Sequence, residues 1–369
     1  MNRNNLYLDT QYKQLDILRA ICAFFVFNCH FFAMFPQKYS LFDYFYILIN
    51  AKAAVIYFFI LSGAVITYST YKKEKDQSTS FKKQTIYFFK RYLRLLPVIF
   101  FSIIITWCIC RLGLLTIQPF IKDSIWLKHF YFANFPKDSF LIALKDCFFN
   151  AYFAKSLFNG NLWTIPYELI VACIIYFLTN KINTKKHFII LLILVSLVTF
   201  TLINTRALFV MSFFWGMIIT KIILSNKIKI NPSYRYILLA IPILLLNIPS
   251  NNTTILNLIT LISVCIIIFT IGNFTFHKIT NIYNYKFIKN FSEISYEFYG
   301  FHLLIFISLT CQLQQSLMQY YNFYTCLIIN YIITFIATYF ISLLFHKYFV
   351  KKIWNKTIKI LFDKYDKDC

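Results

Sequence analysis

A succession of long apolar runs, separated by short polar connections, is the feature that most constrains this chain. Hydrophobic residues make up 59% of its 369 residues, and charged residues only 14%. A water-soluble core of this size does not need so much apolar surface, whereas about 20 consecutive apolar residues can cross a bilayer as a helix. The sequence therefore predicts an all-α, polytopic membrane protein.

The apolar runs and the turn residues between them predict about ten transmembrane helices. Their expected ranges are 16–35, 46–69, 95–114, 165–180, 188–203, 206–224, 236–249, 254–275, 292–313 and 324–345. The first run is too long and too charged for the core of a signal peptide, so we expect it to be retained. Residues 1–350 are expected to form one membrane domain, followed by a basic cytoplasmic tail, 351–369.

The basic residues predict the orientation. They gather in alternate connections (72–94, 181–186, 221–235 and 278–289) and in the tail. Cytoplasmic loops are enriched in Lys and Arg, so both termini are expected inside, in the inner (cytoplasmic) membrane. This distribution accounts for the net charge of +23 without a nucleic-acid partner, so the bilayer is the expected partner.

The long connection 115–164 is expected on the outer side. Residues 140–158 (FLIALKDCFFNAYFAKSLF) are apolar but carry Lys145, Asp146 and Lys155. An eleventh crossing here would invert every later basic connection. An amphipathic helix at the outer interface therefore fits the charges better.

Two ionisable residues, Arg19 and His30, lie within the first apolar run. Eleven helical steps return a side chain to within about 20° of its starting direction, so the two share a face about 16 Å apart. An intramembrane Arg costs about 2.5–3.5 kcal/mol or more and suggests a functional site. Alternatively, Asp16 pairs with Arg19 one turn away, and His30 only bonds a neighbouring helix.

Two further clusters have a structural and a functional interpretation. Ser62 and Gly63 in FFILSG favour close helix packing, with a hydroxyl exposed to a cavity as the alternative. Arg91 and Arg94 lie one helical turn apart beside the predicted cytoplasmic surface. They either anchor the helix among anionic headgroups or bind a phosphate, which suits the guanidinium fork.

The remaining clusters lie in spans four and nine. Trp163 suits a membrane interface, and Glu168 in an otherwise uncharged span should face a polar cavity or a partner. In FSEISYEFYGFH, one helical face carries Ser295, Tyr299 and His302, which either bond other helices or line a cavity. Glu293 and Glu297 are interpreted as a solvated first turn. Because no His, Cys and Asp cluster has ligand spacing, we expect no metal site.

Taken in order, these motifs resemble the membrane acyltransferase 3 family, whose members O-acylate surface sugars and related acceptors. The matching pieces are LDILR with His30 eleven residues after Arg19, FFILSG, RYLRLLP, LWTIPYE and ISYEFYGFH, over residues 15–302. The resemblance carries the family's motif residues to Arg19, His30, Arg91, Arg94, Trp163, Glu168, Ser295, Tyr296, Tyr299 and His302. Pro166, Tyr167, Glu297 and Gly300 depart from the family pattern.

The resemblance implies a mechanism without a permanently bound cofactor. Acyl-CoA, expected as acetyl-CoA, would place its phosphates on Arg91 and Arg94, with His30 as general base or transient acyl carrier. Arg19 would position the donor or stabilise an oxyanion, and Glu168 would orient His30 or the acceptor, a surface or lipid-linked glycan.

The substrate path would be lined by Ser62, Trp163, Ser295, Tyr299 and His302. Some relatives carry an added hydrolase-like domain, so the membrane domain is expected to act alone or with a partner protein. The alternatives are a transporter or flippase, because ionisable residues in spans also mark permeation pathways, and an accessory subunit of polysaccharide export.

Overall fold

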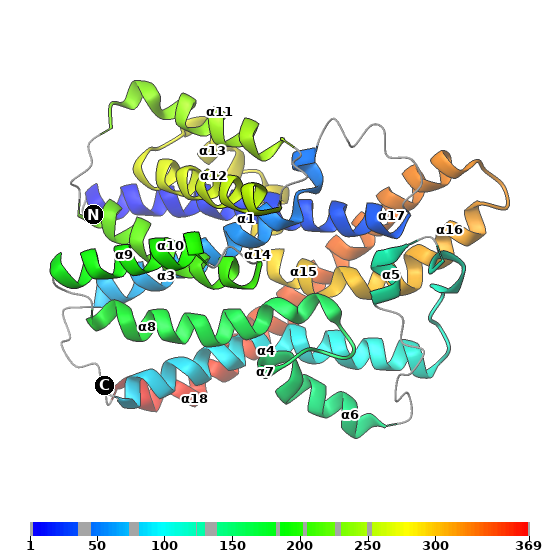
Figure 1. Cartoon of the computed structure of the whole chain (residues 1–369). Helices are drawn as coiled ribbons and strands as arrows, with labels where there is room; N and C mark the ends of the chain where they lie inside the picture. Colours follow the sequence, from blue (N-terminus) through cyan, green and yellow to red (C-terminus); the bar gives the residue numbers. More distant parts are fainter. Residues whose placement is uncertain are drawn as a thin grey trace. The chain divides into compact units, whose positions relative to one another are not determined.

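The computed structural model describes residues 3–35, 46–73, 81–122, 124–129, 139–181, 185–201, 205–225, 230–248 and 253–367. Every regular element in these ranges is a helix, which confirms the predicted all-α class (Figure 1). The longer helices are α1 (Arg3–Met34), α3 (Ala51–Lys73), α4 (Phe81–Arg111), α8 (Ala172–Lys181), α9 (Lys185–Thr201), α10 (Thr205–Leu224), α11 (Arg235–Leu246), α12 (Thr253–Asn273), α15 (Ser295–Ile305) and α17 (Phe323–Leu344).

Fewer helices than the ten predicted spans are both long and apolar enough to cross a membrane. Among the described residues, seven helices satisfy it, and α14 (Lys286–Glu293) followed by Ser295–Leu317 forms an eighth, broken span. Two shorter apolar helices, Lys186–Thr199 and Pro232–Leu246, coincide with two further predicted spans. The count of ten and the inward orientation of both termini therefore stay predictions.

Three segments differ in detail from the sequence-based expectation. Helix α4 begins at Phe81, before the start expected at residue 95, and contains Pro97 in its interior. The expected amphipathic helix ends at Phe153, after α6 (Phe140–Lys145), the π-helical η3 (Asp146–Asn150) and α7 (Ala151–Phe153). The basic tail is helical, because α17 continues through η8 (Phe345–Trp354) into α18 (Asn355–Lys367).

The chain divides into two compact units. The first comprises residues 1–26, 40–88 and 167–293, and the second comprises 27–39, 89–166 and 294–369. In the first unit, α3 packs against α10, α8 and α12, and α11 packs against α12. Gly63 on α3 lies against the backbone of Phe213 on α10, and Gly216 on α10 lies against the backbone of Ile60. These two glycines confirm the interpretation of FFILSG as a close-packing motif.

In the second unit, aromatic rings fill the core between helices. The Phe27 ring of α1 lies 5.3 Å from Phe298, 5.1 Å from Phe306 and 5.6 Å from Phe335, measured between centroids. In the same unit, η8 packs along α4, where Trp354 Nε1 donates to the Leu93 carbonyl at 2.8 Å. The predicted tail is thus part of the packed unit.

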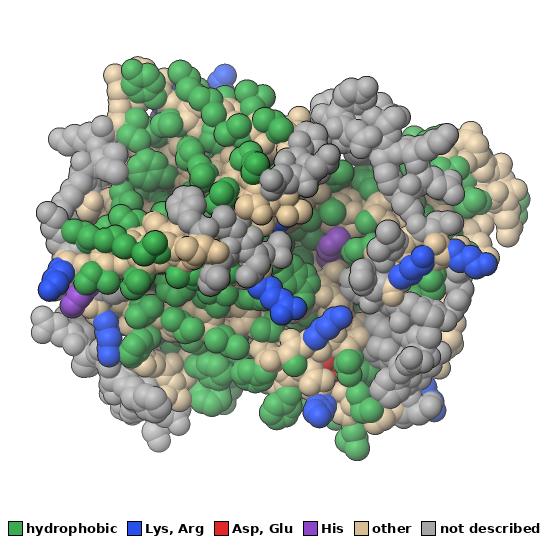
Figure 2. Space-filling model, in the orientation of Figure 1, with side chains coloured by type: hydrophobic (Ala, Val, Ile, Leu, Met, Phe, Trp, Pro, Cys, Tyr) green, Lys and Arg blue, Asp and Glu red, His purple; other side chains and the backbone are tan. Residues whose placement is uncertain are grey.

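Large apolar side chains also cover much of the described surface. Figure 2 shows many hydrophobic side chains on the drawn face, with several Lys and Arg side chains among them. Exposed apolar residues recur at helical spacing, as on α17, where Ile328, Ile332 and Ile336 are 62%, 51% and 47% exposed. Such stripes are costly in water and suit contact with lipid chains.

Candidate active site

A pair of histidines forms the centre of the polar site in the second unit. His30 on α1 and His302 on α15 are joined by a hydrogen bond of 2.8 Å between Nδ1 of His30 and Nε2 of His302. Their rings are nearly parallel, at 19°, and His302 is fully buried. Trp126 of α5 (Ile125–His129) stacks on His30, with centroids 5.0 Å apart. His30 is therefore held by a histidine and an aromatic ring.

The Asn161 side chain contacts this pair at His302. Its Nδ2 lies 2.9 Å from Nε2 of His302. An amide nitrogen only donates, so Nε2 of His302 carries a lone pair and accepts. If Nε2 of His302 accepts, its single lone pair is shared by the Asn161 amide and a hydrogen on Nδ1 of His30. This leaves the lone pair of His30 on its own Nε2, the ring atom that can take up a proton.

Asn161 is fixed by contacts on each side. It lies in η4 (Gly160–Thr164), and its N–H donates to Asn159 Oδ1 at 3.1 Å. Its carbonyl accepts from the Tyr299 hydroxyl, which also lies 3.2 Å from Thr164 Oγ1. The Asn159 amide donates to the Gly300 carbonyl at 3.0 Å. The turn is therefore fastened to α15, the helix that carries His302.

A buried carboxylate holds the beginning of this turn. Asp146 Oδ2 accepts from the Ser156 hydroxyl at 2.8 Å and from the N–H groups of Leu157 and Phe158 at 2.9 and 3.0 Å. Burial raises the pKa of Asp146, while these hydrogen bonds lower it. Ser156 Oγ in turn accepts from the Asn159 N–H at 3.1 Å. Asp146 therefore stabilises the loop that leads into Asn161.

The first unit contains the predicted acidic residue. Glu168 lies in the π-helical η5 (Tyr167–Val171), and the Ser62 hydroxyl lies 3.2 Å from each of its carboxylate oxygens. Glu168 thus has a polar partner, as its place in an apolar span required. In FFILSG, Gly63 serves helix packing, while the hydroxyl of the preceding residue contacts Glu168.

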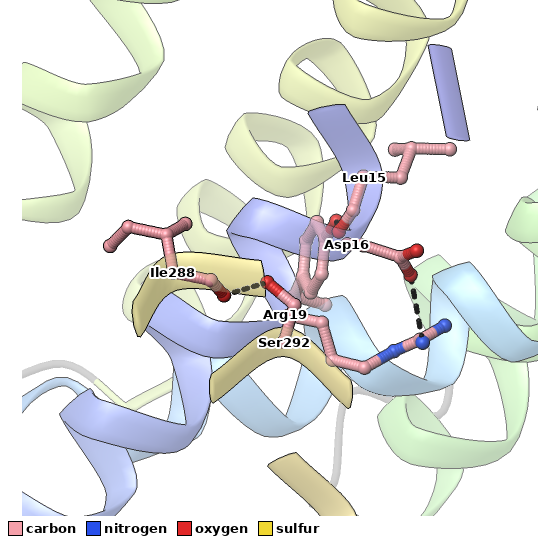
Figure 3. Close-up of polar contacts among 6 residues, drawn as sticks. Leu15, Asp16, Arg19, Ile288 and Ser292 are labelled. Carbon is pink, nitrogen blue, oxygen red and sulfur yellow. Dashed lines mark hydrogen bonds and ion pairs between the residues drawn. The ribbon is translucent and has the colours of Figure 1, made fainter. Parts of the chain in front are cut away.

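Arg19 forms the local ion pair that was its structural alternative. Its Nη1 lies 2.9 Å from Asp16 Oδ1, one turn earlier on α1, and both side chains are 33% exposed (Figure 3). The Tyr57 hydroxyl donates to the neighbouring Leu15 carbonyl at 2.9 Å. The ion pair reduces the cost of burying Arg19. A functional role for Arg19 stays a prediction.

The other predicted residues lie on the expected helices. Arg91 is half-buried and Arg94 exposed on α4, while Ser295 is buried on α15 and Trp163 is half-buried in η4. Their roles in binding a phosphate or a substrate stay predictions. Among the described residues, no group of His, Cys, Asp and Glu could hold a metal ion.

One expectation was wrong. Glu297 is not in a solvated turn: it is only 4% exposed, and its Oε1 lies 2.7 Å from Nδ1 of His346. The partner comes from η8, at the end of the last predicted span, so spacing along α15 gave no sign of it.

Sequence reasoning also missed Asn161, Trp126 and the role of Asp146. Asn161 belongs to an Asn-Gly-Asn segment that indicates a turn, and a turn signal does not say where a side chain points. Asp146 was seen only as an interruption of an apolar stretch. A carboxylate that cannot face lipid was the available signal.

These helices and their buried polar centre define a multi-pass membrane protein with a histidine pair inside one of its units. The family model described as an acyltransferase domain, acyltransferase 3, matches residues 12–347, and the chain therefore belongs to the membrane acyltransferase 3 family. No curated protein and no solved structure matches it significantly.

Proposed function

We propose that this membrane acyltransferase moves an acetyl group from cytoplasmic acetyl-CoA to a hydroxyl group of a surface or lipid-linked glycan, with His30 as general base. The observation that carries the proposal is the chain of contacts from the Asn161 amide to His302 and from His302 to Nδ1 of His30, from which we infer a lone pair on Nε2 of His30. A neutral imidazole held by its other nitrogen suits proton abstraction from an alcohol.

In the proposed reaction, Nε2 of His30 takes the proton of the acceptor hydroxyl as its oxygen attacks the thioester carbonyl. The new C–O bond forms, the C–S bond breaks, and the leaving thiolate takes the proton back from the imidazolium. Arg91 and Arg94 would bind the donor phosphates, and Arg19 would position the donor or stabilise the oxyanion. Glu168 would orient the acceptor.

The test is deletion of the gene and complementation with wild type, His30→Ala or Arg91→Ala, followed by measurement of O-acyl groups on surface glycans. His277, exposed on α13 (His277–Tyr283), gives the matched control, His277→Ala. Loss of a general base typically costs about 10²–10⁴-fold in rate. We expect that loss for His30→Ala at a normal membrane level, and wild-type acylation for the control.

Full acylation in the His30→Ala strain would refute the catalytic role. Unchanged acylation with blocked polymer export would instead favour a transporter. Since Nε2 is also the atom that would carry an acyl group, mass spectrometry of a stopped reaction separates the two roles. An acetylated His30 peptide would indicate a carrier, and its absence under turnover would support a base.

A further inference from the structure

We propose that Asn161 is a positioning residue of the acyl transfer, because its amide determines which nitrogens of His302 and His30 carry hydrogen. The inference rests on the proposed role of His30 and deepens it. It concerns one contact, the 2.9 Å approach of Asn161 Nδ2 to Nε2 of His302.

A histidine pair alone has no fixed direction. Each neutral ring has one donor and one acceptor nitrogen, so the 2.8 Å bond between His30 and His302 can form with the hydrogen on either side. The choice decides whether His30 presents a lone pair or a hydrogen at Nε2. A third group with a fixed donor must break this symmetry, and the Asn161 amide is such a group.

The position of the amide is set by the backbone around it. Both backbone polar groups of Asn161 are bonded, to Asn159 and to Tyr299, and Asn161 is only 2% exposed. Asn159 performs the turn-closing role expected of an asparagine here. The Asn161 side chain is therefore not needed to close the turn, and its amide points to the histidine pair.

The loop before it adds rigidity. Asp146 holds residues 156–158 through three hydrogen bonds, and Ser156 passes this support to Asn159. A donor that must hold a precise direction needs such support, because a loose amide can rotate and present its oxygen instead.

Among the described residues, three titratable side chains on the elements around the histidine pair have other partners or are exposed. On α15 the phenol Tyr299 is bonded to Asn161, and on α17 the phenol Tyr331 donates to Asn28 at 2.7 Å. On α5, next to Trp126, Lys128 is exposed. Asn161 is thus a fixed donor within hydrogen-bond distance of the pair, 2.9 Å from Nε2 of His302.

The decisive variant is Asn161→Asp, which is nearly isosteric but presents only acceptor oxygens. It should draw a hydrogen onto Nε2 of His302, where the new carboxylate and Nδ1 of His30 share it as acceptors, so that the hydrogen of His30 moves to Nε2. A carboxylate at this place also favours a cationic pair. We expect at least a tenfold loss of acyl transfer at neutral pH and an acidic limb of the pH–rate profile at least one pH unit higher.

A second readout does not depend on activity. In protein carrying ¹⁵N-labelled histidine, the ring nitrogen shifts distinguish the Nδ1–H from the Nε2–H form, with His30→Ala assigning the signals. We expect the Nδ1–H form of His30 in wild type, a changed form in Asn161→Asp, and mixed forms in Asn161→Ala. The matched control is Asn330→Asp, which changes a fully buried amide of α17 that bonds Thr310 and Gln314.

An unchanged His30 spectrum in both Asn161 variants would overturn the inference, as would a pH profile that moves equally in Asn330→Asp. If Asn161→Asp does not elute as a folded species, Asn161→Ala alone decides through its spectrum. If His30→Ala retains full acylation, the proposed function fails, while the spectrum still reports whether Asn161 fixes the tautomer.

Discussion

Replacement of Gly63 by alanine should separate two helices of the first unit. A Cβ at Gly63 would meet the carbonyl oxygen of Phe213, lie 2.9 Å from its carbonyl carbon and 3.1 Å from its Cα. Carbon atoms pack at about 3.5–4.0 Å, so α3 and α10 must move apart by roughly 1 Å. All three obstructing atoms belong to the backbone, and a side-chain rotation cannot relieve the overlap.

The cost follows from this geometry. Forcing a methyl group into a close-packed contact typically costs about 1–3 kcal/mol, and the backbone obstruction places Gly63→Ala at the upper end. In a domain of 150–250 residues this corresponds to a fall in melting temperature of about 6–12 °C. Gly216→Ala faces a reciprocal overlap, 2.9 Å from the Ala64 nitrogen and from the Ile60 carbonyl carbon. One separation relieves both overlaps, so the double variant should lose less than the sum.

The assay is thermal unfolding of the detergent-purified protein, followed by size-exclusion chromatography. Gly272→Ala is the matched control, because its Cβ would meet only the Cδ1 tip of Ile223, at 2.5 Å, and that side chain can change rotamer. We expect the control to melt within about 2 °C of wild type, since alanine also gains helix propensity of up to ~1 kcal/mol. Equal melting of Gly63→Ala and Gly272→Ala would refute the packing argument.

Three further outcomes are expected. Burial raises the pKa of Asp146, so wild type loses stability as the pH rises and this buried carboxyl ionises. The melting temperature of Asp146→Asn minus that of wild type should therefore be larger at pH 7 than at pH 4. An equal difference at the two pH values would contradict this. His346→Ala should cost about 1–3 kcal/mol because the buried Glu297 side chain loses its hydrogen-bond partner, and adding Glu297→Gln should recover part of the melting temperature. Asn330→Leu should lower stability by about 1–3 kcal/mol, measured by the same thermal assay, because the Thr310 carbonyl loses its donor.

The fold class and most helices could be predicted because hydrophobic runs are local in sequence. The break before Ser295 could not, because the polar residues at 292–295 are compatible both with one continuous helix and with a bend between two helices. Glu297 was misjudged for a similar reason: its partner, His346, lies 49 residues away on another helix.

The site was partly predictable. Spacing along α15 correctly placed Tyr299 and His302 on one side, and both contact Asn161. The meeting of His30 with His302, 272 residues apart, depends on how α1 packs against α15, which no local pattern encodes. The direction of the Asn161 amide depends on several loop hydrogen bonds together. The sequence alone predicts which residue types belong to the site, whereas tertiary packing determines which of these residues contact one another.

The direction of the Glu168 side chain relative to α8 depends on the number of residues in the π-helical turn at Tyr167–Val171. A π-helical turn contains about one residue more than an α-helical turn, so the helix beyond it is rotated by about 100°. Removing one residue from this turn would restore a regular helix. The direction of the Glu168 side chain relative to α8 would then change by about 100°. Among related sequences, a one-residue gap here would therefore change the surroundings of the carboxylate even where the glutamate itself is kept.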